Sequence, residues 1–129
     1  MKLTLVTPVL PVTDVLRTQQ YYRDVLAFQI DWRDRDLFGG VSSGDVSLFF
    51  QKTESPPTGL ACVLNTTNAD EVFVLYSQLG AKIVDPIATR PWGMREFTVE
   101  DINGHFLRIG HVDETAADYS QFERGDIGV

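Results

Sequence analysis

The sequence predicts an α+β fold made of two βαβββ modules, whose strands form a concave mixed sheet with the helices on its outer face. Three observations support this prediction. Extended and helical patterns recur in the same order in two halves of about 55 residues, an amphipathic helix follows the opening strand of each half, and turn-forming residues separate the short strands that come next. Because 129 residues are about one domain's worth of chain, we expect a single domain over 1–112, with modules at about 4–52 and 59–111, and a C-terminal tail over 113–129.

The first module is expected to open with a strand over 4–12. Pro8 and Pro11 interrupt this segment, and since proline cannot donate to a neighbouring strand, the segment should lie at a sheet edge. Asp14 is a favourable N-cap for a helix over about 15–26. Three extended segments follow, and the last two are separated by a hairpin-type turn at 42–45; the expected strands are 28–33, 37–42 and 46–51.

The second module follows a linker at 52–59 that is rich in turn formers. A strand is expected over 60–66, and Asn68 with Glu71 forms a start resembling a capping box for a helix that ends at Gly80. The extended segments after it are 81–85, 95–100 and 105–111. The offset between the halves grows from 52, for Val12 and Leu64, to 60, for Gly44 and Gly104, and we place the additional residues in a loop at 86–92.

Composition excludes several classes of protein. The formal charge of −7 and the lack of a Lys and Arg cluster argue against a nucleic-acid partner. No apolar run is long enough for a membrane span, and the first residues lack the pattern of a signal peptide, so we expect a cytoplasmic protein. Cys62 is the only cysteine, which excludes an internal disulfide, and its apolar neighbours predict an inert core thiol.

The segment 91–97, Pro-Trp-Gly-Met-Arg-Glu-Phe, and the turn 101–104, Asp-Ile-Asn-Gly, are the most specific motifs of the chain. Together with the opening segment 8–14 and the pair Tyr21 and Tyr22, they resemble the glyoxalase, bleomycin-resistance and extradiol-dioxygenase superfamily, also called vicinal oxygen chelate proteins. The similarity covers residues 5 to about 111 and is greatest to the bleomycin-resistance proteins. Ile102 stands where that family normally has proline, a change that a turn tolerates.

The resemblance implies four metal-ligand positions, which fall on Thr7, Leu48, one residue of 59–61, and Arg108. None is a metal-ligating type, and an arginine opposes a cation, so we expect neither a metal nor another cofactor. His105 and His111 lie about 20 Å apart on an extended strand, at roughly 3.3 Å per residue, and cannot share one ion. Both are expected as surface or turn histidines.

No nucleophilic elbow of the G-x-S-x-G type is present, and Cys62 has no histidine nearby in the sequence. Glu96 and Glu100 share one face of a strand and could act as an acid and base pair, although a solvated or hydrogen-bonded sheet face is the simpler interpretation. We therefore assign no catalytic residue and favour a binding protein over an enzyme.

Strand alternation directs Phe97, Val99, Leu107 and Ile109 toward the helices and Glu96, Thr98, Phe106 and Arg108 toward the concave side, with Val46, Leu48 and Phe50 as counterparts from the first module. The resemblance adds Trp32, Phe38 and Trp92, since aromatic residues at these places line a groove for a flat heteroaromatic ligand in the bleomycin-resistance proteins. The alternative for Trp92 is a loop plug that covers a core edge. The candidate ligand-binding residues are Trp32, Phe38, Leu48, Phe50, Trp92, Arg95, Phe106 and Arg108.

The sequence thus predicts a metal-free protein of the bleomycin-resistance type, which sequesters a planar aromatic, antibiotic-like ligand, cationic or neutral, and so provides antibiotic resistance. The resemblance implies a homodimer with the binding groove between the subunits and the N-terminal strand exchanged near Pro8. Two alternatives stay open. One is an enzyme of the superfamily, a lyase, isomerase or dioxygenase, with atypical or absent metal ligands, and the other is a partner subunit or regulator without a ligand. The tail at 113–129 is expected as a short helix on the partner or a frayed end.

Overall fold

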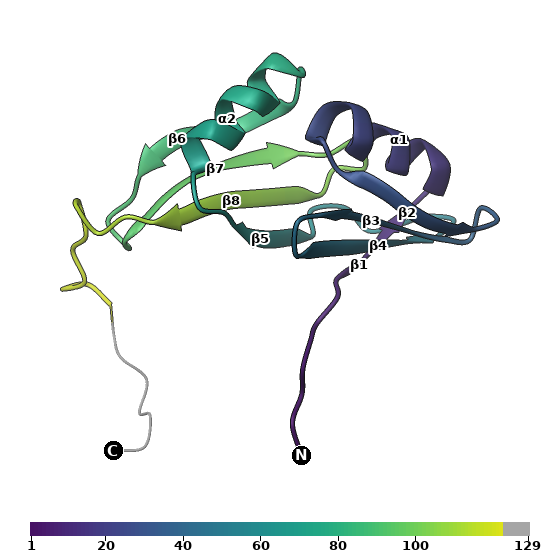
Figure 1. The fold of residues 1–129 in the computed structure, drawn as a ribbon, viewed down its shortest axis with the longest axis horizontal. Coiled ribbons are helices and arrows are strands. Elements are labelled where there is room, and N and C mark those ends of the chain that lie inside the picture. Colours follow the sequence, from purple (N-terminus) through teal and green to yellow (C-terminus); the bar gives the residue numbers. More distant parts are fainter. Residues whose placement is uncertain (123–129) are drawn as a thin grey trace.

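The computed structural model describes residues 1–122 and consists of two four-stranded sheets with both helices on the same side (Figure 1). The first module contains β1 (Val9–Val12), α1 (Val15–Leu26), β2 (Gln29–Asp34), β3 (Phe38–Ser43) and β4 (Val46–Lys52). The second contains β5 (Ala61–Asn65), α2 (Ala69–Gln78), β6 (Lys82–Thr89), β7 (Met94–Glu100) and β8 (Phe106–Val112). The predicted α+β fold of two βαβββ modules is confirmed.

The two sheets repeat the same topology. Their strand orders are β1-β4-β3-β2 and β5-β8-β7-β6. The first strand of each module pairs in parallel with the last, and the remaining pairs are antiparallel, so both sheets are mixed. The proline-containing strand lies at a sheet edge as predicted, but it begins at Val9, later than expected, and residues 1–8 belong to no strand.

Both helices begin where their capping residues predict. The Asp14 side chain accepts a hydrogen bond from the Arg17 backbone N–H at 2.9 Å. Asn68 accepts from the Glu71 backbone N–H at 3.1 Å, and Gly80 follows the end of α2 with a φ of +85°, a conformation that favours glycine. Neither helix in residues 1–122 is long and apolar enough to cross a membrane.

The core lies between the helices and the adjoining sheet faces, and it is one continuous apolar cluster with residues from both modules. In the first module the ring of Tyr22 meets the rings of Phe28 and Phe50 at centroid distances of 5.4 Å and 4.9 Å. In the second, Phe73 packs edge-to-face on Phe97 at 5.2 Å. Such contacts add about 0.5 to 1.5 kcal/mol per pair beyond simple burial.

A buried polar network joins the two modules through His105. The ring is fully buried, its Nε2 lies 2.8 Å from the Pro11 carbonyl oxygen, and its Nδ1 accepts from the Leu60 N–H at 3.3 Å. Asp101 is also buried and accepts from the His105 N–H at 2.9 Å and from the Tyr22 hydroxyl at 2.6 Å. Burial, aided by the charge of Asp101, raises the pKa of Tyr22 well above its usual value, so the phenol stays a donor. His105 therefore lies next to the predicted turn but is not at the surface.

The prediction of a loop over 86–92 is wrong for most of this segment. Most of this segment belongs to β6, which runs to Thr89 and contains register shifts after Ile83 and after Asp85. Pro86 is tolerated there because β6 lies at a sheet edge. The additional residues of the second module are distributed over these irregularities and over a β7–β8 turn that is longer than the β3–β4 turn. They do not form a single insertion.

The first part of the tail packs on the chain's own β6–β7 loop. The Asp113 N–H donates to the Gly93 carbonyl at 2.9 Å and the Asp118 N–H to the Pro91 carbonyl at 2.8 Å. The Tyr119 hydroxyl lies where a side chain on Gly93 would point. Residues 113–122 thus form turns against the loop that carries Trp92, without a helix, and residues 123–129 of the predicted tail lie outside the described part of the chain.

Candidate ligand-binding site

Each sheet has a second face, turned away from the helices, which we call the open face. On β4, Leu48 and Phe50 are fully buried against the core, whereas Ser47, Phe49 and Gln51 alternate with them on the open face. The sequence-based placement of Leu48 and Phe50 on the ligand side is therefore corrected: they pack on the helix side. The three consecutive apolar residues at 48–50 fit either register, and contact with the core selects the one observed.

Three aromatic residues of the first module share the open face, and we call Trp32, Phe38 and Phe49 the aromatic platform. Trp32 and Phe49 flank Gly40 on β3, and their rings meet edge-to-face at 5.1 Å and 81°. A Cβ built on Gly40 would lie 2.5 Å from the indole nitrogen of Trp32, so the absence of a side chain there leaves room for the indole. Trp32 and Phe38 remain 41% and 39% exposed, which leaves aromatic surface for a ligand.

A β-bulge directs Trp32 to the open face. The register of β2 shifts between Ile30, which packs on the core, and Trp32. The amide of Gln19, fully buried on α1, donates to the Trp32 carbonyl at 2.7 Å and to the Gly40 carbonyl at 3.2 Å. Gln19 was not predicted as a site residue, although its place on the apolar stripe of α1, four residues after Val15, marks it as a buried polar residue.

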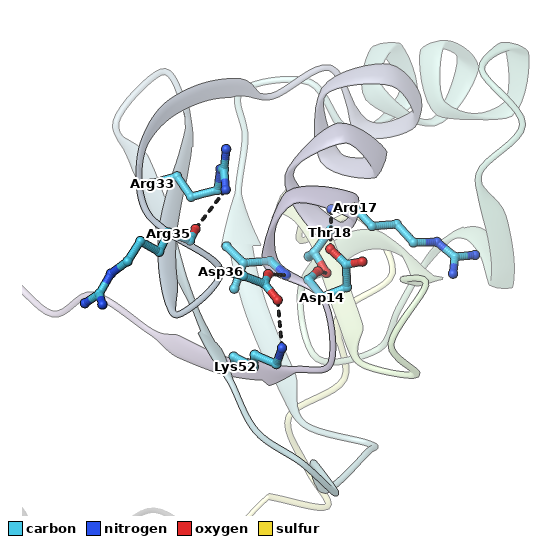
Figure 2. A network of polar contacts seen from close by, with 8 residues as sticks. Asp14, Arg17, Thr18, Arg33, Arg35, Asp36 and Lys52 are labelled. Carbon is cyan, nitrogen blue, oxygen red and sulfur yellow. Dashed lines mark hydrogen bonds and ion pairs between the residues drawn. The ribbon is translucent and has the colours of Figure 1, made fainter.

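A polar network at the start of α1 anchors the β2–β3 loop that precedes Phe38 (Figure 2). Asp36 accepts from Lys52 Nζ at 2.8 Å and from the Val15 N–H at 3.0 Å. The hydrogen bond from Lys52, followed by that from Val15, lowers the pKa of Asp36. Arg33 donates to the Arg35 carbonyl at 2.9 Å across the same loop. These contacts tie the loop to both α1 and β4.

In the second module, the indole of Trp92 is held by Glu96. Its Nε1–H donates to Glu96 Oε1 at 2.6 Å, and the glutamate is only 4% exposed. Glu96 is paired with Gly110 on β8, where an added Cβ would lie 2.8 Å from Glu96 Cβ. The second carboxylate oxygen, Oε2, is 3.8 Å from Arg108 Nε. Trp92, Glu96 and Arg108 form the second polar and aromatic group of the open face, which we call the Trp92 cluster.

Arg95 and Phe106 lie on opposite sides of the second sheet. Arg95 faces α2, where it donates to both carboxylate oxygens of Asp70 at 2.8 Å and 2.7 Å and to Thr89 Oγ1 at 2.9 Å. The hydrogen bond from Arg95 lowers the pKa of Asp70. Phe106 is half-buried on the open face, two residues before Arg108. The predicted inward set of Phe97, Val99, Leu107 and Ile109 is confirmed.

The open face extends from one end of the molecule to the other. Figure 1 shows β2 at one end of the molecule and β6 at the other. The structure therefore places Trp32 and Phe38 on the same open face and connects Trp92 to Arg108 through Glu96. The strands β2 and β6 lie apart in a single chain.

The residues at the metal-ligand positions implied by the resemblance do not fit a divalent cation. Leu48 points into the core, and Arg108 carries a positive charge beside Glu96. Within residues 1–122, no three His, Cys, Asp or Glu side chains gather in a group that could hold a metal ion. His111 Nδ1 accepts from the Ala69 N–H at 2.8 Å at the start of α2. Burial raises the pKa of the Cys62 thiol, which disfavours the reactive thiolate.

Comparison with known proteins agrees with this architecture. Residues 4–109 match the family described as the Glyoxalase/Bleomycin resistance protein/Dioxygenase superfamily, and no curated protein matches the sequence significantly. The solved structure of the bleomycin-binding protein from bleomycin-producing Streptomyces verticillus, complexed with copper(II)-bleomycin, is similar with a TM-score of 0.72 and 24% identity over 84% of this chain and 96% of that one. The bleomycin resistance determinant encoded on transposon Tn5 gives 0.76 and 22% over 85% and 98%. TioX from Micromonospora sp. ML1 gives 0.74 and 22% over 84% and 98%. At these identities the similarities establish the fold.

Proposed function

Because the chain belongs to the glyoxalase/bleomycin resistance protein/dioxygenase superfamily, we propose that it is a metal-free binding protein that sequesters a planar aromatic small molecule on its open face. The observation that carries the proposal is the aromatic platform, in which Trp32 and Phe38 expose ring surface beside Phe49. A planar ligand can stack on such surfaces with about 0.5 to 1.5 kcal/mol per aromatic pair beyond burial. Protection of the cell then follows from mass action, without a chemical step.

The binding groove lies between two copies of the chain in this proposal. In one copy, β2, which carries Trp32, and β6, which ends shortly before Trp92, lie at opposite ends of the molecule (Figure 1). A two-fold axis places the platform of one copy opposite the Trp92 cluster of the other, and repeats the same contact on the far side. The ligand ring is then held between Trp32 of one subunit and Trp92 of the second.

The N-terminal arm, residues 1–8, supports a dimer with strand exchange. The arm extends away from the sheets on the side opposite the helices (Figure 1), and Leu3, Leu5 and Val6 are more than 80% exposed. Apolar side chains in such a segment favour coverage by another surface. Exchange about Pro8 gives them that cover, because β1 already pairs with β4 from Val9 onward.

Charge favours a cationic or neutral guest. The chain has a net charge of −7, which disfavours an anionic guest, while in the Trp92 cluster the Glu96 carboxylate is balanced by Arg108. Relatives of the same fold are described as binding bleomycin, which supports an antibiotic-like ligand and a role in resistance.

Tryptophan fluorescence tests the proposal directly, since Trp32 and Trp92 are the only two tryptophans. Titration with bleomycin-like and phenazine-like compounds is expected to give saturable quenching and a higher melting temperature for at least one class. Trp92→Phe leaves Trp32 as the reporter of the platform, and Trp32→Phe leaves Trp92. Leu16→Ala, an exposed apolar change on α1, is the matched control and should bind like the wild type.

If neither class of compound quenches the tryptophan fluorescence, the result counts against the sequestration function. Metal analysis after dialysis separates the enzymatic alternative, because stoichiometric Zn, Fe, Mn or Ni would overturn the metal-free assignment. Removal of residues 2–7 is expected to weaken the dimer in sedimentation experiments. An unchanged dimer would exclude arm exchange while leaving ligand binding to be judged by the titration.

A further inference from the structure

A cavity of about 390 Å³ lies on the helix side of the molecule, between the end of α1, the β3–β4 turn and α2. Its volume falls in the range of small-molecule sites, about 300 to 1,000 Å³. Most of the wall is apolar and comes from both modules, with Leu26, Phe28, Val46, Leu64, Val72 and Ile109.

This cavity is separate from the open face. Ile109, which forms part of the wall, lies on the helix side of β8, whereas the preceding Arg108 belongs to the Trp92 cluster on the open face. Because successive residues of a strand point to opposite faces, the second sheet lies between the two sites. A ligand in this cavity is therefore independent of the proposed sequestration function.

The hydroxyl of Tyr76 gives the cavity a specific polar group. Tyr76 lines the cavity, is only 5% exposed, and makes no side-chain hydrogen bond within residues 1–122. Its ring is held edge-to-face against Phe97 at 6.1 Å and 82°. The hydroxyl is not among the buried side-chain polar atoms that lack a partner within residues 1–122, so it is open to solvent and free to donate to a ligand. Burial raises the pKa of Tyr76 to about 12, and the group therefore remains a donor at neutral pH.

The polar part of the lining selects against anions. Asn65 and Thr66, at the end of β5, and the Asp45 carboxylate, in the β3–β4 turn, complete the wall. A negative group would meet this carboxylate and the net charge of −7. We propose that the cavity binds a small, neutral, mostly apolar molecule whose single carbonyl or ether oxygen accepts a hydrogen bond from the Tyr76 hydroxyl.

The pair 1-tetralone and tetralin tests this site, because the two bicyclic probes differ in one carbonyl group. Each is titrated into the ¹⁵N-labelled full chain. The amides of Gly44, Asn65 and Thr66 report on the cavity, and the indole N–H signals of Trp32 and Trp92 report on the open face. We expect 1-tetralone to shift the cavity amides saturably and to bind about two- to twelvefold more tightly than tetralin, the effect of one net hydrogen bond.

Tyr76→Phe removes only the unpaired hydroxyl and should fold normally. It is expected to abolish the preference for 1-tetralone while leaving tetralin binding unchanged. Val72→Phe, which narrows the cavity without adding a tryptophan, should weaken both probes without affecting the quenching of the open-face tryptophans. The proposal is overturned if 1-tetralone shifts only the indole signals, or if Tyr76→Phe keeps the preference for 1-tetralone over tetralin. It is also overturned if the cavity amides respond to protein concentration and not to the probe, because a second copy of the chain would then cover the cavity.

Discussion

Gly39 and Gly40 are adjacent on β3 but lie against different parts of the molecule, and alanine at each position should have a different effect. A Cβ on Gly39 would lie 2.6 Å from Gln19 Nε2 and 2.7 Å from Val15 Cγ1, both on α1. The atoms nearest to a Cβ on Gly40 all belong to the indole of Trp32, the first at 2.5 Å, and that side chain is 41% exposed. Gly39→Ala thus perturbs the core, and Gly40→Ala perturbs the aromatic platform.

The magnitudes separate the two variants. Overpacking at a buried site costs about 1 to 3 kcal/mol, while replacing glycine by alanine recovers about 0.4 to 1 kcal/mol through the unfolded chain. From the midpoints of these two ranges, Gly39→Ala should therefore lower the free energy of unfolding by about 1.3 kcal/mol. Gly40→Ala moves the indole of Trp32, which can turn toward solvent, and loses about 0.5 to 1.5 kcal/mol from the Trp32–Phe49 ring pair. The gain from replacing glycine by alanine largely offsets this loss. Its effect should appear in ligand binding, weakened about two- to twelvefold.

Urea unfolding followed by circular dichroism measures the first effect, and fluorescence titration of the folded variants measures the second. Equal destabilisation by Gly40→Ala and Gly39→Ala would contradict the different surroundings of the two glycines. A neutral Gly39→Ala would contradict them as well, because the neighbouring Gln19 amide would then not be fixed in place.

Three further predictions concern titratable groups. Since the pKa of Tyr76 is raised to about 12, this tyrosine ionises in the unfolded chain before it does in the folded protein as pH rises above 10. The free energy of unfolding should therefore fall by up to about 3 kcal/mol between pH 10 and 12. Urea unfolding across this range measures the loss, which should be smaller in Tyr76→Phe. Tyr22→Phe should cost about 1 to 3 kcal/mol at neutral pH in the same assay, because a buried oxygen of Asp101 loses its donor; a neutral result would show that water replaces the hydroxyl. The lowered pKa of Asp70 means that its ionised form stabilises the fold at pH values above the usual aspartate pKa, and this contribution is lost as pH falls through the lowered pKa. Asp70→Asn should therefore reduce the fall in melting temperature at acidic pH. An unchanged dependence of melting temperature on pH would mean that the pair with Arg95 contributes nothing.

The sequence predicts the fold well because its signals are local and agree with each other. Asp14 and Asn68 cap the helices where the patterns place them, and in β7 the alternation of Glu96 and Phe97 assigns both faces correctly. Such signals depend on a few neighbouring residues. The repeat then fixes the order of the elements in the second module once the first is known.

The candidate site was harder to predict because it depends on contacts between distant segments. Phe49 was missed since the apolar run around it has no alternation, and only the packing of α1 decides which residues are buried. Arg95 faces the helix because Asp70, 25 positions earlier, neutralises it there. Trp32 reaches the open face through a bulge held by Gln19, a partner 13 positions away.

The His105 contacts also bear on how the chain behaves as a folding unit. A half of this size, about 55 residues, is close to the lower limit for an independent core, and the ring of His105 bonds both the end of β1 and the residue before β5. Neither module can open without breaking this connection or exposing the shared core. A single proteolytic cut in the linker at 53–60 should accordingly leave two fragments that remain associated and melt together in one transition, as expected for a duplicated unit whose halves have become mutually dependent.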